Sequence, residues 1–316
     1  MKLVVFPLLL ALLLLAVACQ GAERPAASPG PTATPQPRVF SDDLGRQVAI
    51  EKVPTRMVAL SPSVVELLYA IGAPPVARPS AADYPEAAKS LTSIGTSYTP
   101  NLEAIVTLKP DLIVADAQIQ RDMIGQLEGL GPPVYAVRVL IFDDVPRNLR
   151  RLGEISAHEA DAERAAAALE EKLRSLQARL PREGPKVLIL VGAASEFSAG
   201  KPSSWAGDIV KRLGAVNVAE GAPDTGRFPG YGAFSLEQIA AQDPDVIIAI
   251  SAAPPGVPPL SRTMADNPLW RGLKAVRTGR VHEVNPTTYV QSAGPRVGEV
   301  IDELAAILYP GLAGGR

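Results

Sequence analysis

The sequence predicts an α/β protein of two lobes, each with a mostly parallel sheet flanked by helices, joined by one long interdomain helix. Three observations support this: an internal duplication, an alternation of strand-like and helix-like segments, and a long helical pattern in mid-chain. The chain has 316 residues, 47% of them hydrophobic and 20% charged, which is typical of a globular protein with two domains of ordinary size.

The amino-terminal segment predicts export. Residues 3–18 form an apolar run after Lys2, shorter than the ~20 residues that a membrane-spanning helix needs. Small residues then precede Cys19, the only cysteine of the chain. We therefore predict a lipoprotein signal peptide over residues 1–18, with Cys19 as the lipid acceptor. The alternative is a plain signal peptide followed by an incidental cysteine.

Residues 19–38 are rich in proline, alanine, serine and threonine and contain almost nothing that could form a core. Such a segment stays extended, because burial cannot offset the entropy lost on ordering. We predict a tether here, followed by an amino-terminal lobe over residues 39–145, a linking helix over 146–181 and a carboxy-terminal lobe over 182–316.

The first predicted strand and helix of the amino-terminal lobe follow each other closely. Residues 57–60 are apolar and predict a strand that leads into Ser61 and Pro62. A helix is predicted from Ser63 to residue 71, ended by Gly72, since glycine readily adopts the left-handed conformation that closes a helix.

The duplication joins residues 101–115 to residues 235–249, and both copies share Leu-Glu-x-Ile, Pro-Asp and a closing apolar run. Asn101 and Ser235 are good helix N-caps. Pro110 and Pro244 end the helices, because the residue before proline avoids helical angles. The apolar residues 112–115 and 246–250 predict strands buried on both faces of a sheet. Each copy is thus a helix, a tight turn and a buried strand.

Further strands are predicted over residues 134–137, 186–191 and 281–284. Between the lobes lies the longest helical pattern, residues 146–180, with leucines at three- and four-residue spacing from Leu169 to Leu180. A helix of that length would span ~50 Å and connect the lobes stiffly. Pro181 and Gly184 follow it.

Composition and motifs exclude several functions. The net charge of −2, without clustered lysine and arginine, argues against a nucleic-acid surface. The two histidines, His158 and His282, cannot build a histidine-rich metal site. The sequence contains no Gly-x-Ser-x-Gly, phosphate-loop or His-Glu-x-x-His motif. We therefore expect no catalysis, no resident metal and no cofactor.

The order of motifs resembles a known family. After the tether the chain carries Ser61-Pro62-Ser63, Asp83-Tyr84-Pro85, the first repeat, the long helical pattern, Phe197-Ser-x-Gly-Lys201, the second repeat, Asn267-Pro-Leu-Trp270 and Gly294-Pro-Arg296. This order is similar to that of the periplasmic binding proteins for ferric siderophores, haem and cobalamin. The resemblance implies two α/β lobes joined by one long helix, with the ligand in the cleft between them and little closure.

The resemblance also implies partners, namely an ABC permease dimer with its ATPase. In that family one glutamate of each lobe docks onto arginines of the permease. By position these are Glu103 and Glu237. Each glutamate alone is better explained as a solvated acid at the positive end of a helix dipole, but two such acids at equivalent places in duplicated lobes favour docking. We expect a monomeric, extracytoplasmic protein that is attached to the membrane by its lipid anchor only and binds no nucleic acid.

Ligands of such proteins tend to lie beyond the carboxyl ends of parallel strands. The residues predicted there are Ser61, Ser63, Ser97, Tyr98, Asp116, Phe197, Ser198 and Tyr231, with Trp205, Arg227 and Tyr289 as second-rank candidates. Core packing is the alternative for Phe197, Trp205 and Tyr289, since large aromatic side chains are usually mostly buried.

The chain departs from the cobalamin-binding members at Ala81, Ser97 and Asp116, which stand where those members carry aromatic residues. The ligand therefore stays open among ferric siderophores, cobalamin and haem, and a haem iron could use Tyr98 or Tyr231 only if that side chain lies in the cleft. The alternative function is a ligand-binding or structural lipoprotein that uses the same fold without transport.

Overall fold

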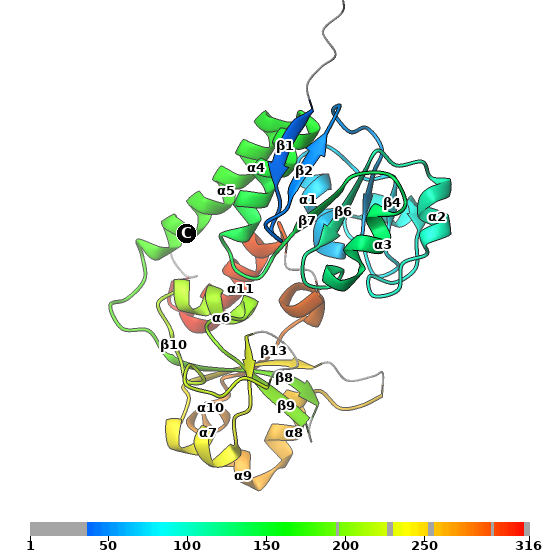
Figure 1. The fold of residues 1–316 in the computed structure, drawn as a ribbon. Coiled ribbons are helices and arrows are strands. Elements are labelled where there is room, and N and C mark those ends of the chain that lie inside the picture. Colours follow the sequence, from blue (N-terminus) through cyan, green and yellow to red (C-terminus); the bar gives the residue numbers. More distant parts are fainter. Residues whose placement is uncertain (1–36, 194–195, 226–229, 252–255, 292–293, 313–316) are drawn as a thin grey trace, which may run out of the picture. The chain divides into compact units, whose positions relative to one another are not determined.

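The computed structural model describes residues 37–193, 196–225, 230–251, 256–291 and 294–312 (Figure 1). Residues 37–316 form one compact unit. The predicted signal peptide and Cys19 lie outside the described residues, as does Arg227. Within the part that is described, no helix is long and apolar enough to cross a membrane.

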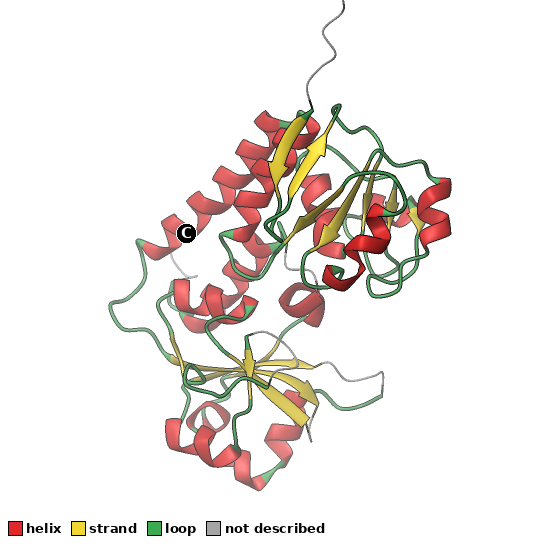
Figure 2. Ribbon diagram, viewed as in Figure 1, coloured by secondary structure: helices red, strands yellow, loops and turns green. Residues whose placement is uncertain are grey.

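The amino-terminal lobe contains a five-stranded parallel sheet (Figure 2). Its strand order is β5 (Thr92–Ser93), β4 (Ala77–Arg78), β3 (Met57–Ala59), β6 (Leu112–Asp116), β7 (Val134–Val137). The side chains of β6 alternate between two cores, as the period of two along a strand requires. Ile113 meets α2 (Leu102–Thr107) and α3 (Ile124–Glu128), while Val114 faces the core that contains α1 (Pro62–Ala70).

A separate antiparallel pair, β1 (Arg38–Ser41) and β2 (Gln47–Ile50), precedes this sheet. The predicted tether is therefore too long at its end, since Arg38 already belongs to β1. The Arg38 guanidinium donates hydrogen bonds to the carbonyl oxygens of Glu154 (3.0 Å) and Ile155 (2.8 Å), which lie at the end of a helix. Two short 3₁₀ helices, η1 (Glu86–Ser90) and η2 (Arg121–Met123), complete the lobe.

The carboxy-terminal lobe has a mixed sheet of order β11 (Tyr231–Gly232), β9 (Glu196–Gly200), β8 (Lys186–Ala193), β12 (Val246–Ser251), β13 (Val281–Glu283), with β10 (Val216–Asn217) beside β8. Strands β8, β10, β12 and β13 pair in parallel, whereas β9 and β11 are antiparallel additions. Its helical segments are α6 (Trp205–Arg212), α7 (Leu236–Gln242), α8 (Leu260–Asp266), α9 (Pro268–Arg271), α10 (Lys274–Arg277), the π-helical η3 (Thr287–Gln291) and α11 (Val297–Leu308).

The predicted helix, turn and strand of each repeat are present. The Asn101 side chain accepts a hydrogen bond from the Ala104 N–H (3.0 Å), and Ser235 accepts one from the Gln238 N–H (3.3 Å). The residues before the two prolines, Lys109 and Asp243, both have left-handed backbone angles, with φ of 47° and 43°. The duplication is therefore a duplication of backbone geometry as well as of sequence.

The aspartate of each Pro-Asp pair fastens the start of the neighbouring strand. Asp111 accepts hydrogen bonds from the backbone N–H groups of Thr55 (2.9 Å) and Arg56 (2.8 Å), just before β3. Asp245 accepts one from the N–H of Lys186 (2.8 Å), the first residue of β8. Each repeat thereby sets the register of its strand against the strand beside it.

The single linking helix predicted over residues 146–181 is wrong in its extent. The chain forms two helices, α4 (Asp144–Ser156) and α5 (Glu159–Gln177), separated by Ala157 in the left-handed conformation. They pack side by side because Gly153 lets α5 approach: a Cβ atom there would stand 2.3 Å from that of Ala162. Only the 19 residues of α5, about 28 Å of helix at 1.5 Å per residue, run on toward the carboxy-terminal lobe.

One hydrophobic core crosses the molecule. It joins Val64 of α1 and Leu149 of α4 to Leu173 of α5, Ile209 of α6 and Ile301 of α11. Smaller cores lie on the far face of each sheet. The two lobes therefore share buried apolar surface along these helices, which resists large relative movement.

Candidate functional site: a groove between the lobes

The carboxyl ends of β3 and β6 bring four predicted site residues into one polar network. The hydroxyl oxygens of Ser61 and Ser63 are 2.9 Å apart. Gln120, which the sequence prediction missed, accepts a hydrogen bond from the N–H of Asp116 (2.7 Å) and donates one to the carbonyl of Ser97 (2.6 Å). All five side chains are buried. The network holds the edge of the sheet in place.

Asp116 is the ionisable member of this network. Burial raises the pKa of its carboxyl above the usual value, although hydrogen bonds from the N–H groups of Gln118 and Ile119 and from Ser61 act in the opposite direction. The Asp116 carboxyl therefore stays protonated up to a higher pH than the carboxyl of an exposed aspartate.

The predicted residues of the carboxy-terminal sheet divide between its two faces. Ser198 pairs with Val191, and Tyr231 pairs with Gly200, so both lie on the face whose buried residues join the shared core. Phe197 points to the opposite face, where its ring meets Trp270 edge-on at 5.6 Å. Phe197 is partly buried and packs against the core of this far face. Burial raises the pKa of the Tyr231 hydroxyl to about 12.

Two second-rank aromatic candidates are also core residues. Trp205 is buried at the start of α6, and its indole N–H donates to the carbonyl of Thr288 (3.1 Å). Tyr289 is fully buried and donates to Glu303 (2.9 Å). Both belong to the shared core, so the prediction that they line a cleft is wrong.

A cavity of about 410 Å³ opens between the lobes, beside the buried network. Pro62, Ala81, Asp83 and Tyr84 line it from the amino-terminal lobe, and Thr287 from η3 lines it from the other lobe, with Glu66 and Arg296 at the boundary. We call this cavity the groove. Ala81, singled out in the sequence as a departure from the cobalamin-binding members, is among the lining residues, as are Asp83, Tyr84 and Arg296 from the sequence motifs.

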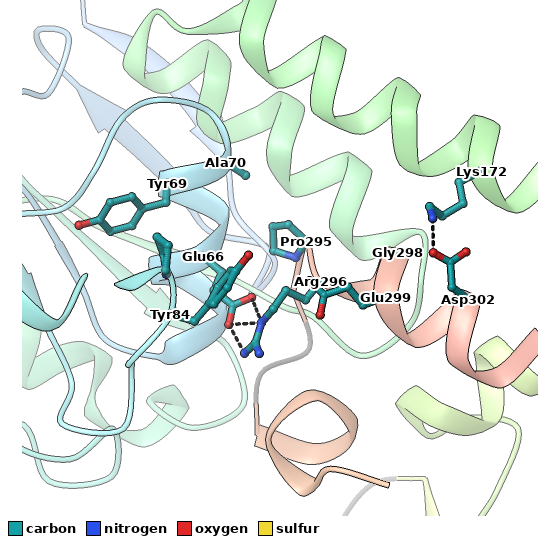
Figure 3. A pocket seen from close by; sticks show the side chains of 11 residues that line it. Glu66, Tyr69, Ala70, Tyr84, Lys172, Pro295, Arg296, Gly298, Glu299 and Asp302 are labelled. Carbon is teal, nitrogen blue, oxygen red and sulfur yellow. Dashed lines mark hydrogen bonds and ion pairs between the residues drawn. The ribbon is translucent and has the colours of Figure 1, made fainter. Parts of the chain in front are cut away.

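An ion pair, drawn in Figure 3 from the side of a neighbouring cavity, forms one wall of the groove. Arg296, which precedes α11, donates to Glu66 of α1 through Nη2 (2.6 Å) and through Nε (3.0 and 3.1 Å). The guanidinium also stacks on the Tyr84 ring, 4.4 Å from its centroid. The sequence motifs Asp-Tyr-Pro and Gly-Pro-Arg signalled Tyr84 and Arg296, but nothing in the sequence indicated that they meet at Glu66.

A second cavity of about 430 Å³ shares this wall (Figure 3). Tyr69 and Ala70 of α1, Lys172 of α5 and Glu299 and Asp302 of α11 line it. The ion pair of Glu66 and Arg296 therefore divides the groove from a cavity bordered by the linking helix.

The predicted docking acids are exposed at corresponding places in the two repeats. Glu103 lies in the first turn of α2, and Glu237 in the first turn of α7. Hydrogen bonds from the Ser235 hydroxyl and from its own backbone N–H lower the pKa of Glu237, so it stays ionised at neutral pH. Tyr98 is 72% exposed and lines neither cavity, so nothing indicates that it contacts a ligand.

The described residues contain no group of three or more histidine, cysteine, aspartate or glutamate side chains that could hold a metal ion.

Comparison with known proteins agrees with this geometry. The model of the periplasmic binding protein family matches residues 57–288, and the chain belongs to this family. It is a substrate-binding protein of the type that serves ABC transport of ferric siderophores, haem and cobalamin.

Among its relatives is the Fe(3+)-citrate-binding protein YfmC of Bacillus subtilis, 29% identical over 281 residues, covering 83% of this chain and 82% of the relative. The B. subtilis substrate-binding lipoprotein YvrC is 29% identical over 95% of this chain and 96% of its own length. The vitamin B12-binding protein of Yersinia pestis is 31% identical over 61% of this chain and 68% of its own.

Among solved structures, a periplasmic haem-binding protein from Pseudomonas aeruginosa superimposes with a TM-score of 0.68 at 25% identity, covering 82% of this chain and 94% of that one. The prediction of two α/β lobes is confirmed.

Proposed function

We propose that this protein is an extracytoplasmic, lipid-anchored receptor that captures a metal chelate in the groove and delivers it to an ABC importer. The observation that carries the proposal is the groove itself, which is lined from both lobes and has a polar, partly aromatic wall. Family membership supports the transport role. The non-transport alternative has no observation of its own in its favour.

We propose a ferric carboxylate chelate as the first ligand to test. The relative YfmC is named for binding Fe(3+)-citrate. The groove offers Tyr84 as a single ring face and small or polar residues elsewhere, including Ala81 and Thr287. A flat macrocycle such as haem or corrin would gain most from aromatic faces on both sides.

Residues 37–316, which form one compact unit, should be titrated with ferric citrate, several ferric siderophores, cobalamin and haem. Binding can be followed by isothermal titration and by thermal shift. We expect saturable binding of one ferric chelate at micromolar or lower concentration, with an Ala81→Trp variant that fills the groove binding at least tenfold more weakly. If none of the probes binds the parent protein, the proposed substrate class is wrong.

We further propose that Glu103 and Glu237 dock onto the two permease subunits. Their support is the matched position at the start of α2 and α7. The double variant Glu103→Arg/Glu237→Arg should abolish uptake of the chelate while leaving its affinity in solution unchanged.

The matched control is Glu51→Arg/Glu220→Arg, which reverses one exposed acid in each lobe away from the repeats. Loss of uptake in both double variants would mean that overall charge, not docking, is responsible. Loss of ligand affinity in the first would place the repeated acids near the ligand instead.

The lipid anchor is proposed from Cys19 and from the likeness to YvrC, which is named as a lipoprotein. A Cys19→Ser variant should lose incorporation of labelled fatty acid and leave the membrane fraction, because at least two acyl chains are needed for stable anchoring. Unchanged membrane attachment of the variant would rule out this anchor.

A further inference from the structure

We infer that Glu66 and Arg296 act together as a latch that holds the two lobes at the groove and limits how fast a ligand leaves. Glu66 belongs to α1, in the amino-terminal lobe. Arg296 immediately precedes α11, some 230 residues later in the chain. The effect on ligand release rests on the proposed function, whereas the effect on lobe movement does not.

The helix that follows Arg296 is fastened to the carboxy-terminal lobe at its other end. The Arg280 guanidinium donates to the carbonyl oxygens of Ile307 (2.9 Å) and Leu308 (3.2 Å) at the end of α11. The hydroxyl of Tyr309 donates to the carbonyl of Leu213, which follows α6, at 2.6 Å. The ion pair therefore connects the amino-terminal lobe to an element that moves with the other lobe.

The geometry of the pair suits a strong and directional connection. The side chains of Glu66 and Arg296 are only 2% and 14% exposed. Two guanidinium nitrogens, Nε and Nη2, contact the carboxylate, and the ring of Tyr84 covers the guanidinium. Hydrogen bonds between ionised groups are stronger than neutral ones, and removing one partner of a buried ion pair is strongly destabilising.

The position of the pair makes it a latch. The shared core of α5, α6 and α11 already joins the lobes, and Phe142 and Asp143 contact Asp208 and Arg212 of α6. The pair of Glu66 and Arg296 instead lines the groove itself. Separating the lobes at the groove must therefore break this pair, even though the shared core keeps the lobes joined elsewhere.

A nearby ion pair offers a matched control. Lys172 of α5 pairs with Asp302 of α11, and both groups line the second cavity. Their side chains are 37% and 58% exposed, and neither lines the groove. Loss of the ion pair between Lys172 and Asp302 should change the distance between the lobes little, because exposed ion pairs contribute little free energy.

The first test needs no ligand. Residues 37–316 contain no cysteine, so spin labels can be placed at Gln126→Cys in α3 and Ala241→Cys in α7, both exposed. We expect the distance distribution between the labels to broaden toward longer distances in the Glu66→Gln and Arg296→Lys variants and to stay unchanged in Asp302→Asn. An unchanged distribution in both groove variants would overturn the proposal.

The second test measures release of bound ferric citrate by stopped flow. We expect release to be about tenfold faster in Arg296→Lys, which loses the two-nitrogen contact with Glu66, with a much smaller change in the association rate, since weakening a buried hydrogen-bonded charge pair acts mainly on dissociation. If ferric citrate does not bind the parent protein, the proposed substrate is wrong and the label distances alone decide about the latch.

Circular dichroism and thermal melts check that each variant is folded. Arg296→Lys keeps the charge and Glu66→Gln keeps the shape, so they perturb the pair in different ways. Unfolding of both variants would show that the pair is part of the structural core, and would overturn the latch.

Discussion

The two lobes use the same repeated unit but differ at the carboxyl end of its buried strand. In both, a side-chain cap begins the helix, a left-handed residue precedes proline, and an aspartate fastens the adjacent strand. At the carboxyl end of the buried strand the likeness stops. Asp116 ends β6 in a polar network, whereas the residue 134 positions later is the buried, apolar Ile250.

The sheets around these strands also differ. The amino-terminal sheet is parallel throughout, whereas the other lobe inserts the antiparallel strands β9 and β11. The difference teaches that the interactions that build the unit are shared, while the residues that end the buried strand, and the strands added around it, are specific to each lobe. The following substitutions test how far this division holds.

The largest effect is expected from Gly207→Ala. Val64 and Gly207 are each the third residue of their helix, and their N–H groups donate to the capping hydroxyls of Ser61 and Ser204. Only the second site requires glycine, since a Cβ atom there would stand 1.8 Å from the carbonyl oxygen of Lys201. We expect a loss of at least about 3 kcal/mol in urea unfolding, or failure to fold.

Gly221→Ala serves as its control, because a Cβ atom there meets nothing within 4 Å. A small effect of Gly207→Ala, similar to that of the control, would mean that the chain can relax around this contact. The two lobes would then be more alike at this helix start than the structure indicates.

The next largest effect is expected at the repeated aspartates. Burial would raise the pKa of Asp111 and of Asp245, but hydrogen bonds from Thr55 and Arg56 in one case, and from Lys274 and Lys186 in the other, lower both pKa values overall. Their contribution to stability is therefore complete above the unfolded pKa of about 3.8 and is lost as the pH falls below it.

At pH 7 we expect Asp111→Asn and Asp245→Asn each to cost about 1 kcal/mol, since both groups are partly exposed to solvent. Added salt should reduce the cost more for Asp245, which also pairs with Lys274 at 2.6 Å, than for Asp111, for which the charge of Lys52 is a minor contribution. Equal salt dependence at the two sites would contradict the assigned contacts. The measurement is urea unfolding at low and high salt.

The helix caps should have similar effects in the two lobes. Asn101→Ala and Ser235→Ala each remove the acceptor of one backbone N–H, and we expect losses of about 1 kcal/mol. Asn101→Asp and Ser235→Thr keep an acceptor and should retain most of the stability. If removing the cap left the free energy of unfolding unchanged in one lobe only, the two repeated units would not contribute equally to stability.

The smallest effect is expected from Asp116→Asn, which concerns the edge where the lobes differ. Because burial raises the pKa of Asp116, the folded protein binds this proton more tightly than the unfolded chain does. Its ionisation therefore lowers stability as the pH rises from about 3.8 through the folded pKa. Removing the carboxylate should flatten this decline in unfolding experiments between pH 4 and 7, and an unchanged slope would contradict the raised pKa.

Much of the fold could be predicted from the sequence because its signals are local. Helix caps, proline and runs of apolar residues act over a few positions, so the strands at residues 57–60, 112–115, 134–137 and 246–250 and both repeat helices were predicted close to their actual bounds. The duplication added the two-lobe arrangement, because two copies of one unit predict two similar sheets.

Tertiary structure alone decided the remaining features. The break at Ala157 accompanies the close packing of α5 against Gly153 of α4, and this packing cannot be read from the periodicity of the helical pattern. Which face of β9 Phe197 occupies depends on the register against β8. The wall of the groove joins Glu66 to Arg296 across most of the chain. Contacts between distant segments depend on how whole elements pack, and that information does not reside in any local stretch of sequence.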